Sequence, residues 1–449
     1  MTQDAAKAAL WKKGVLSWKL KPHQRPIYEF FIEADGRPHH MVRVGNISRQ
    51  TGKTFTALVV AMEKALRRKR QKILYAAPTF KMLERYVWPS VSTILEDCPL
   101  ELRPEVVPSK ACIRFTNGSV IYLVHTNQDR GESVRGNSFD FVVVDEAGYV
   151  DGLDGFLRSI VIPTFTRTGG RAIVFSTPPE TPGHAFAALV AEAKAQNRYL
   201  ERDIDQTDIT PQMRAELAEA SGGEDSSTFL REYKCQIIVD QEKAVVPEWA
   251  KHAPAIVVPV APPDEYVKRI TAVDWGFRDP AGVLYGYYDF RRAKVCIQRS
   301  RALKGYRTDQ IGSAILADEA ELWGEVKPYR RIADCDEQNQ LDLMQSSKVS
   351  VSITSKEGGL DSMVNRVRMA VQRHTFEVDP SCVELIFHLE SATWNDNRAD
   401  WTRTEAGGHW DCLAALMYLL PAVPYSLNPY PDEPVGVSAA AYFRKPCLL

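Results

Sequence analysis

A polar loop that contains glycine, lysine and threonine in succession is the chain's clearest chemical feature. It reads V-G-N-I-S-R-Q-T-G-K-T-F over Val44–Phe55. β-Branched residues precede the loop and an apolar run follows it, so a strand, a loop and a helix are predicted. Backbone N–H groups at such a helix start can hold phosphate oxygens, while Lys53 reaches the outer phosphates and the Thr54 hydroxyl holds Mg²⁺. The loop therefore indicates binding of a nucleoside triphosphate.

The loop departs from the usual phosphate-loop pattern. Ile47 stands where that pattern has glycine, and Arg49 lies within the loop, so an ordinary strand-to-helix turn is the alternative. The segment Phe141–Gly148 reads F-V-V-V-D-E-A-G, a short apolar strand that ends in two carboxylates. Asp145 would complete a Mg²⁺ site and Glu146 would activate water. Together the two segments predict an ATPase.

Composition and length indicate a globular protein of two domains. Of 449 residues, 45% are hydrophobic and 25% are charged, as in ordinary soluble domains, and the length favours two cores. The formal net charge is −1, which does not by itself indicate a nucleic-acid-binding protein. No apolar run approaches the ~18 residues of a membrane span. Lysines interrupt Met1–Leu20, so no signal peptide is expected and the protein should act in the cytosol.

The cysteines do not indicate a metal site or a disulfide framework. The chain has eight of them, without a C-x-x-C pair. We expect reduced thiols that mostly pack in the interior.

Short apolar strands alternate with helical segments in the first half of the chain. This alternation predicts an α/β fold with a mostly parallel sheet covered on both faces. Ligands bind at the carboxyl ends of such strands, where Thr54, Asp145 and Ser176 are expected to lie. Recurring prolines predict a linker after this domain. The predicted boundaries are 1–243 for the first domain, 244–266 for the linker, 267–424 for the second domain and 425–449 for a flexible tail.

Three aspartates at the ends of predicted elements form a second constellation. Asp274 and Asp334 each close a strand, and Asp411 opens the last apolar helix. Helix capping and turn formation are the alternatives for each residue. Taken together, the three carboxylates suit a ribonuclease H-like site, in which carboxylates bridge two divalent metals. Asp336 and Glu337 follow Asp334 closely, and their contribution is left open.

Gln24 and two groups of basic residues are further candidates for binding. Gln24 precedes the loop strand, where some translocating ATPases use a glutamine to read adenine; an exposed polar residue is the alternative. The basic groups would contact a phosphate backbone without reading sequence, or would be solvated surface. They are Arg67, Arg68, Lys69, Arg70 and Lys72 in the first domain, and Arg291, Arg292, Lys294, Arg299, Arg301, Lys304 and Arg307 in the second.

Over nearly its whole length the chain resembles the large terminase subunit of tailed bacteriophages, a DNA-packaging motor and nuclease. The variant phosphate loop, with no leading glycine, is a habit of that family. The motifs that carry the resemblance are S-R-Q-T-G-K-T (Ser48–Thr54), V-R-G-N-S-F-D-F-V-V-V-D-E (Val134–Glu146), F-S-T-P (Phe175–Pro178), A-V-D-W-G (Ala272–Gly276), A-D-C-D-E (Ala333–Glu337) and H-W-D-C-L-A-A-L-M-Y (His409–Tyr418).

The resemblance implies a fold and a role for each matching residue. The implied fold is a P-loop (ASCE-type) ATPase domain followed by a ribonuclease H-like nuclease domain. Glu146 is implied to be the catalytic carboxylate and Arg135 the arginine finger, with Arg130 as the next candidate. The implied nuclease residues are Asp274, Asp334 and Asp411, and the implied metal ligands are these three with Thr54 and Asp145. The implied nucleotide-binding residues are Gln24, Ser48, Arg49, Gln50, Thr51, Gly52, Lys53, Thr54, Asp145, Ser176 and Thr177, the last two within the coupling motif.

The function implied by the resemblance is ATP-driven packaging of double-stranded viral DNA into the procapsid, with metal-dependent endonucleolytic cutting of the DNA concatemer. The implied cofactors are ATP, Mg²⁺ at the ATPase site, and Mg²⁺ or Mn²⁺, as two ions, at the nuclease site. The implied partners are double-stranded DNA, the portal protein, the small terminase subunit and copies of the chain in a ring; a monomer in solution is left open. No membrane is involved, and the expected location is the host cell cytoplasm.

Two other classes of function remain to be weighed. A helicase or remodelling ATPase would have a second domain that binds nucleic acid without cutting it. A non-catalytic scaffold with an inactive nucleotide fold is disfavoured, because Lys53, Asp145 and Glu146 are all present. Cleavage of plasmid DNA by the second domain would separate the first alternative from a nuclease, and ATP turnover would exclude the second.

Overall fold

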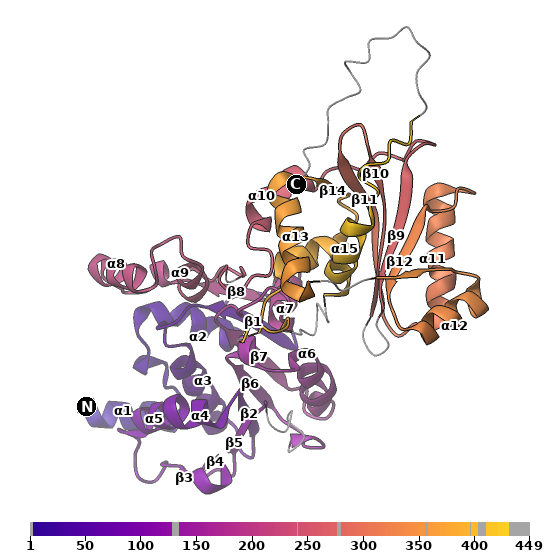
Figure 1. Cartoon of the computed structure of the whole chain (residues 1–449). Helices are drawn as coiled ribbons and strands as arrows, with labels where there is room; N and C mark the ends of the chain where they lie inside the picture. The colour runs from indigo at the N-terminus through magenta and orange to yellow at the C-terminus, as the bar shows by residue number, and fades with distance from the viewer. Residues whose placement is uncertain are drawn as a thin grey trace. The chain divides into compact units, whose positions relative to one another are not determined.

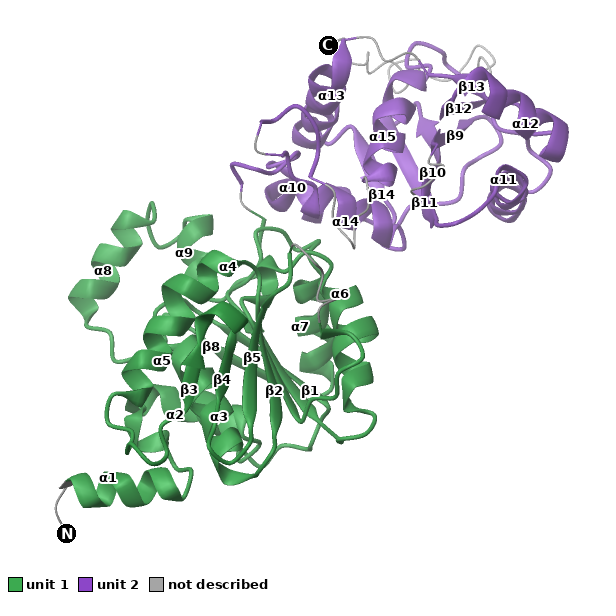
Figure 2. Ribbon diagram, turned by 90° about the horizontal axis from the view of Figure 1, so that it is seen from below, with its two compact units in different colours: residues 1–240 green, residues 241–449 purple. Residues whose placement is uncertain are grey.

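A computed structural model describes residues 3–127, 134–239, 241–275, 280–354, 358–395, 397–402 and 410–430. The chain divides into two units, Met1–Asp240 and Gln241–Leu449 (Figures 1 and 2). Each is an α/β unit built on its own sheet, as the sequence predicts. No helix in the described part of the chain is long and apolar enough to cross a membrane.

The first unit is built on a sheet of eight strands in the order β3-β4-β5-β2-β6-β7-β1-β8. All neighbours from β5 to β8 pair in parallel, whereas β3, β4 and β5 pair antiparallel at one edge. Strands β4 and β5 form an antiparallel hairpin around Asn117–Gly118. The strands are β1 (Val42–Ile47), β2 (Lys72–Ala77), β3 (Glu105–Val107), β4 (Cys112–Arg114), β5 (Val120–His125), β6 (Phe141–Asp145), β7 (Arg171–Ser176) and β8 (Tyr199–Arg202).

Helices cover both faces of this sheet (Figure 1). Helices α2, α3 and α5 share one apolar core with the sheet, and α6, α7 and the π-helix η7 (Phe156–Val161) share the other. The α-helices are α1 (Gln3–Lys12), α2 (Arg25–Phe31), α3 (Lys53–Arg67), α4 (Phe80–Met82), α5 (Trp88–Leu95), α6 (Leu153–Gly155), α7 (Ala185–Ala195), α8 (Pro211–Ala220) and α9 (Ser227–Glu232).

Alternation along β2 and β6 decides which side chains face α3. Side chains of successive strand residues point to opposite faces of a sheet. Phe141 and Val143 lie in the core shared with α3, and Val142 and Val144 lie in the opposite core. Asp145 comes two residues after Val143 and so lies on the same face of β6, with its carboxylate pointing towards α3. Tyr75 of β2 lies in the core on the same face.

The helical segment that follows β2 is not a continuous α-helix. It consists of α4, a π-helical turn η3 (Leu83–Val87) and α5. The Thr79 side chain accepts a hydrogen bond from the Met82 N–H, at 3.4 Å, and so caps the N-terminus. Pro89, which has no N–H to donate, follows the π-helical turn.

The second unit has a mixed sheet of six strands in the order β13-β12-β9-β10-β11-β14. β9, β10 and β11 form an antiparallel meander, while β12 joins β9 in parallel. The strands are β9 (Lys268–Asp274), β10 (Ala281–Asp289), β11 (Lys294–Leu303), β12 (Arg330–Asp334), β13 (Ser352–Ile353) and β14 (Phe376–Val378).

Two layers of helices cover the second sheet (Figures 1 and 2). The larger core lies under α10, α13, α14 and α15, and the smaller core under α11 and α12. Helix α15 is buried almost all round, which explains its near-continuous apolar sequence. The helices are α10 (Trp249–Ile256), α11 (Thr308–Trp323), α12 (Glu337–Ser347), α13 (Gly359–Arg373), α14 (Val383–Ser391) and α15 (Asp411–Ala422).

The expected linker over 244–266 needs correction. It contains helix α10, and Val245, Val246, Trp249 and Ile256 are buried in the larger core of the second unit. Recurring prolines suggested an unpacked segment, but the apolar residues between them supply part of that core. Pro254 lies inside α10 near its end.

The predicted tail over 425–449 is partly a packed segment. The Tyr425 ring packs edge-on against Tyr288, with centroids 5.2 Å apart, and the Arg291 guanidinium lies over the Tyr430 ring. Residues 431–449 lie outside the described part of the chain.

Candidate active sites

Glycine at the start of α3 allows the phosphate-binding loop to close. Gly52 is the N-cap of α3 and has a φ of 75°, a left-handed conformation that favours glycine. A Cβ atom on Gly52 would lie 2.0 Å from Nε2 of Gln24. The first N–H groups of α3 have no partner within the helix. The loop therefore presents backbone donors at a positive helix end, as phosphate binding requires.

Lys53 joins the loop to the end of β6. Its ammonium group lies 3.1 Å from Oε1 of Glu146 and donates to the Ile47 carbonyl at 3.4 Å. Oε2 of Glu146 accepts a hydrogen bond from the Ser176 hydroxyl at 3.2 Å. Three adjacent parallel strands, β1, β6 and β7, thus bring the predicted lysine, glutamate and serine together at their carboxyl ends.

Asp145 is held by two hydroxyl groups. Its Oδ2 accepts from the Thr54 hydroxyl at 2.8 Å and from the Tyr75 hydroxyl at 2.6 Å. Oδ1 is buried and has no hydrogen-bond partner. Burial, followed by the charge of Glu146, raises the pKa of Asp145 to about 6. A buried carboxylate oxygen without a partner, next to the Thr54 hydroxyl, fits a divalent cation with oxygen ligands.

Gln24 is a buried residue, so the exposed-polar alternative is wrong. Only 6% of its surface is accessible. Its side-chain N–H donates to the Thr51 carbonyl at 3.3 Å, and its oxygen accepts from the Lys21 N–H at 2.9 Å. The short 3₁₀ turn η2 (Pro22–Gln24) therefore lies directly against the phosphate-binding loop.

The remaining loop residues have different surroundings. Arg49 forms an ion pair with Glu232 of α9, in which Nε of Arg49 lies 2.5 Å from Oε2 of Glu232. Gln50 has a φ of 62°. Ser48 and Thr51 are buried, and the Thr51 hydroxyl donates to the Ser48 carbonyl at 3.0 Å.

Arg135 differs in exposure from the buried residues described above. It is exposed in the loop that leads to β6. Arg130, the other candidate for an arginine finger, lies outside the described residues. Thr177, from the predicted coupling motif, is buried immediately after β7.

In the second unit, strand register brings two of the three aspartates together. Asp274 at the end of β9 pairs directly with Asp334 at the end of β12. Ile270 and Ala272 precede Asp274 on the face that carries α15, and Ile332 precedes Asp334 on that same face. Both aspartates therefore point towards the α15 side of the sheet.

Asp411 reaches the same region through the backbone of α15. Gly282 of β10 is paired with Asp274, and a Cβ on Gly282 would lie 2.3 Å from the carbonyl carbon of Asp411. The start of α15 thus rests on the strand next to Asp274. Trp410, rather than Asp411, occupies the N-cap position, so the capping alternative for Asp411 is wrong.

Two further side chains support this acidic cluster. The Tyr418 hydroxyl donates to Oδ2 of Asp334 at 3.0 Å, and burial, followed by Asp274 and Asp334, raises the Tyr418 pKa. Nδ1 of His388 accepts from the Cys412 N–H at 3.2 Å, and burial lowers the His388 pKa to about 4. The neutral imidazole therefore caps one of the first N–H groups of α15.

The residues after Asp334 are explained by helix capping. The Asp336 side chain accepts from the Asn339 N–H at 2.7 Å and is the N-cap of α12.

Among the described residues, no three His, Cys, Asp or Glu side chains are grouped closely enough to hold a metal ion. Residues 276–279 and 403–409, which adjoin Trp275 and Trp410, are outside the described part.

Two comparisons show which known proteins this chain is similar to. Residues 44–247 match the family model described as terminase large subunit, T4likevirus-type, N-terminal. The chain is 25% identical over 381 residues to the terminase large subunit of Escherichia phage T5, covering 81% of this chain and 82% of that protein. The chain is therefore similar to terminase large subunits, by a family model over residues 44–247 and by a curated relative over most of its length. The resemblance carried by the sequence motifs is confirmed.

A solved large terminase shows that the likeness extends over both units. The crystal structure of the HK97 bacteriophage large terminase covers 94% of this chain and 100% of that chain, with a TM-score of 0.54 and 12% identity. At that identity the match shows the fold alone. The predicted fold class is confirmed for this chain: a P-loop ATPase fold with a mostly parallel sheet, followed by a ribonuclease H-like α/β fold.

Several predicted DNA-contacting cations of the second unit are engaged in ion pairs. Arg299 and Arg301 each lie 2.7 Å from Asp318, and Arg292 lies 2.8 Å from Glu377. Such pairs leave less charge for a phosphate backbone. The structure therefore favours the solvated-surface alternative for these three arginines.

The sequence analysis missed two tyrosines, although the sequence carried a signal for each. Tyr75 lies in an apolar strand on the same face as Asp145. Tyr418 lies seven residues after Asp411, two helical turns along, and so shares a face of α15 with it. In each unit a buried tyrosine donates to a strand-end aspartate.

Proposed function

We propose that the first unit is an ATP-driven motor that packages double-stranded viral DNA into the procapsid, and that the second unit is a metal-dependent endonuclease that cuts the DNA concatemer. The observation that carries the proposal is that each unit gathers its own carboxylates at the ends of its strands: Asp145 with Glu146 in one, and Asp274 with Asp334 in the other.

In the ATPase site, Lys53 and the N–H groups at the start of α3 bind the phosphates, and Gln24 reads adenine. Mg²⁺, when bound, neutralises phosphate charge; Thr54 and Asp145 would hold it. Glu146 orients the attacking water, since its carboxylate is already fixed by Lys53 and Ser176.

Arg135 is proposed as the arginine finger. Its exposed loop leaves open whether it acts on its own subunit's ATP or on a neighbour's. The Ser176 contact with Glu146 provides the link through which Ser176 and Thr177 couple hydrolysis to movement.

In the nuclease site, Asp274, Asp334 and Asp411 would hold two Mg²⁺ or Mn²⁺ ions, an all-oxygen donor set that suits either metal. Bound metals would activate water and stabilise the leaving oxygen. The chain's own contribution is to fix the carboxylates: strand register sets Asp274 beside Asp334, and Gly282 seats the start of α15.

We further propose that the protein works in the host cell cytoplasm with double-stranded DNA, the portal protein and the small terminase subunit, as a ring of copies on the portal. These partners follow from the family.

Two variants of the full chain test the proposal. Lys53→Ala removes the phosphate-binding cation and should abolish ATP turnover while Mn²⁺-dependent cutting of plasmid remains. Asp274→Ala should abolish cutting while ATP turnover remains, because one lost carboxylate opens the two-metal site. If the parent chain turns over ATP but does not nick plasmid with either metal, the remodelling-ATPase alternative replaces the proposal.

A further inference from the structure

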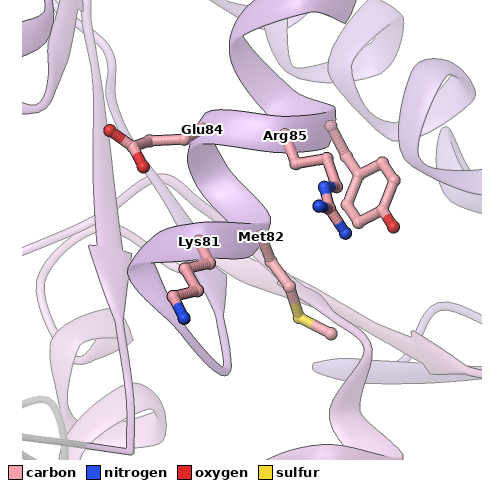
Figure 3. Close-up of a pocket in the computed structure, with 5 residues that line it drawn as sticks. Lys81, Met82, Glu84 and Arg85 are labelled. Atoms are coloured by element: carbon pink, nitrogen blue, oxygen red, sulfur yellow. The ribbon is translucent and has the colours of Figure 1, made fainter.

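We propose that the exposed face of α4 and η3 contacts the DNA backbone during translocation, an inference that rests on the proposed motor function. An open hollow of about 590 Å³ lies on this face (Figure 3). Its lining residues are Lys81, Met82, Glu84, Arg85 and Tyr86.

The cations of this face are available to an anionic partner. Lys81 and Arg85 are exposed and lie four residues apart, about one helical turn. Figure 3 shows the Glu84 carboxylate pointing to the opposite side from Arg85. Within the described part of the chain, neither cation forms an ion pair, whereas Arg49 and Arg214 of the same unit are paired with Glu232 and Glu224.

The chemistry of the face suits phosphate oxygens. Lysine and arginine supply the sequence-independent contacts of DNA binding, and tyrosine hydroxyls also donate to phosphates. Tyr86 is 53% exposed. A duplex backbone is the occupant favoured here, because a motor that moves DNA of any sequence needs contacts that do not read bases.

The opposite side of the same segment is tied to the nucleotide site. Leu83 and Val87 are buried in the core that includes Leu58 of α3, the helix that begins at the phosphate-binding loop. The segment also follows β2 directly, and Tyr75 of β2 donates to Asp145. A rearrangement at the nucleotide site thus has two routes to this face, through α3 and through β2.

The π-helical turn strengthens this assignment. A π-turn inside a helix is uncommon and is found frequently at functional sites. Here it spans Leu83–Val87, so it carries Arg85 and Tyr86 on its exposed side and Leu83 and Val87 on its buried side.

The test is duplex binding by the full-length Lys81→Ala/Arg85→Ala variant, measured with a short DNA duplex of mixed sequence over a series of salt concentrations. We expect weaker binding, and a slope of log K against log salt that is smaller by about 2, because each phosphate contact contributes about 0.9. The matched control is Lys13→Ala/Arg167→Ala, which removes one exposed lysine and one exposed arginine elsewhere in the first unit and should leave affinity and slope near those of the parent.

A third variant tests the effect of the negative charge on DNA affinity. Glu84→Gln removes the one carboxylate of the face and should tighten binding or leave it unchanged. Melting temperatures close to that of the parent would show that all three variants fold.

Each outcome decides a separate point. Unchanged affinity and slope in the Lys81/Arg85 variant would overturn the inference. Equal losses in that variant and in the control would overturn it as well, because the effect would then be one of overall charge. A parent chain that turns over ATP yet binds no duplex would refute the proposed motor, and the inference with it.

Discussion

At the scale of single residues, Asp145 is placed where its charge is costly without a cation. It is buried beside Glu146, and one of its oxygens has no partner. An uncompensated buried carboxylate lowers the stability of the folded state and makes that stability depend on pH.

We predict that Asp145→Asn raises the free energy of unfolding at pH 8 in EDTA, by up to about 3 kcal/mol. The Asp145 pKa is about 6 in the folded state against a usual 3.8, so the folded chain keeps a proton that the unfolded chain releases. The stabilisation that this retained proton gives to the folded state is complete below pH ~4 and is lost as the pH rises through about 6.

Denaturant unfolding of both proteins at pH 5 and pH 8 measures this difference. The gap between variant and parent in the free energy of unfolding should be about half as large at pH 5 as at pH 8. A gap of the same size at both values would mean that Asp145 does not titrate in this range.

A second residue-scale prediction concerns Tyr418. Tyr418→Phe should lower metal-dependent cutting about ten- to hundredfold, because a hydrogen bond to a charged group is worth about 1.5–3 kcal/mol. The midpoint of a Mn²⁺ binding titration should also move to higher concentration, which a purely structural role would not require.

Tyr425→Phe is the matched control, since it removes a hydroxyl that donates only to the Leu420 carbonyl, at 2.9 Å. ATP turnover should be unchanged in both variants. Normal cutting and metal binding by the Tyr418 variant would reduce that residue to a packing role.

At the scale of elements, the packing of α15 against β10 determines how close Asp411 lies to Asp274 and Asp334. Gly282→Ala would place a Cβ 2.3 Å from the Asp411 carbonyl carbon. Backbone cannot rotate away as a side chain can, so α15 must shift, at a cost of about 1–3 kcal/mol.

We therefore predict that Gly282→Ala lowers the melting temperature and abolishes cutting, while ATP turnover by the other unit continues. Gly155→Ala is the control, because nothing lies within 4 Å of a Cβ at that glycine. Retained cutting by the Gly282 variant would show that Asp411 is not needed at its present position.

Elements near a strong local pattern were predictable from the sequence. The strand–loop–helix around Lys53 and the strand ending at Asp145 combine apolar periodicity with turn residues, and both form as expected. The packing of Trp249 was not predictable, because prolines conceal the helical pattern of α10 and its partners lie far along the chain.

For the same reason, local patterns do not encode how the residues of a site meet. The meeting of Tyr418 with Asp334 depends on tertiary packing between residues 84 positions apart. The pairing of Asp274 with Asp334 depends on a strand register set across an intervening antiparallel hairpin and a helix. Neither contact can be read from spacing alone.

At the scale of the whole molecule, the division into units fixes where the chain can be cut. Apolar residues between the two predicted domains, Val245, Val246, Trp249 and Ile256, belong to the core of the second unit. A fragment that begins near Asp264 lacks all four of them.

We predict that residues 241–449 form a fragment that folds and cuts DNA without ATP, whereas a fragment starting at Asp264 is much less stable. Loss of Trp249 alone should cost about 3–5 kcal/mol. Circular dichroism and thermal melting of the two fragments give the comparison. Equal stability would mean that α10 contributes little to that core.

Glu146 has a backbone conformation that favours glycine, with φ 51° and ψ 45°. For a residue with a Cβ this conformation costs about 1–2 kcal/mol. The contacts of the carboxylate with Lys53 and Ser176 offset part of that cost, and the role proposed for Glu146 at the ATPase site would be the reason to keep it. Selection for folding and selection for packaging therefore act in opposite directions at this position. In a gene copy that no longer has to package DNA, we expect Glu146 to be replaced early by glycine or asparagine, which relieves the backbone but leaves the buried Lys53 without its ion-pair partner.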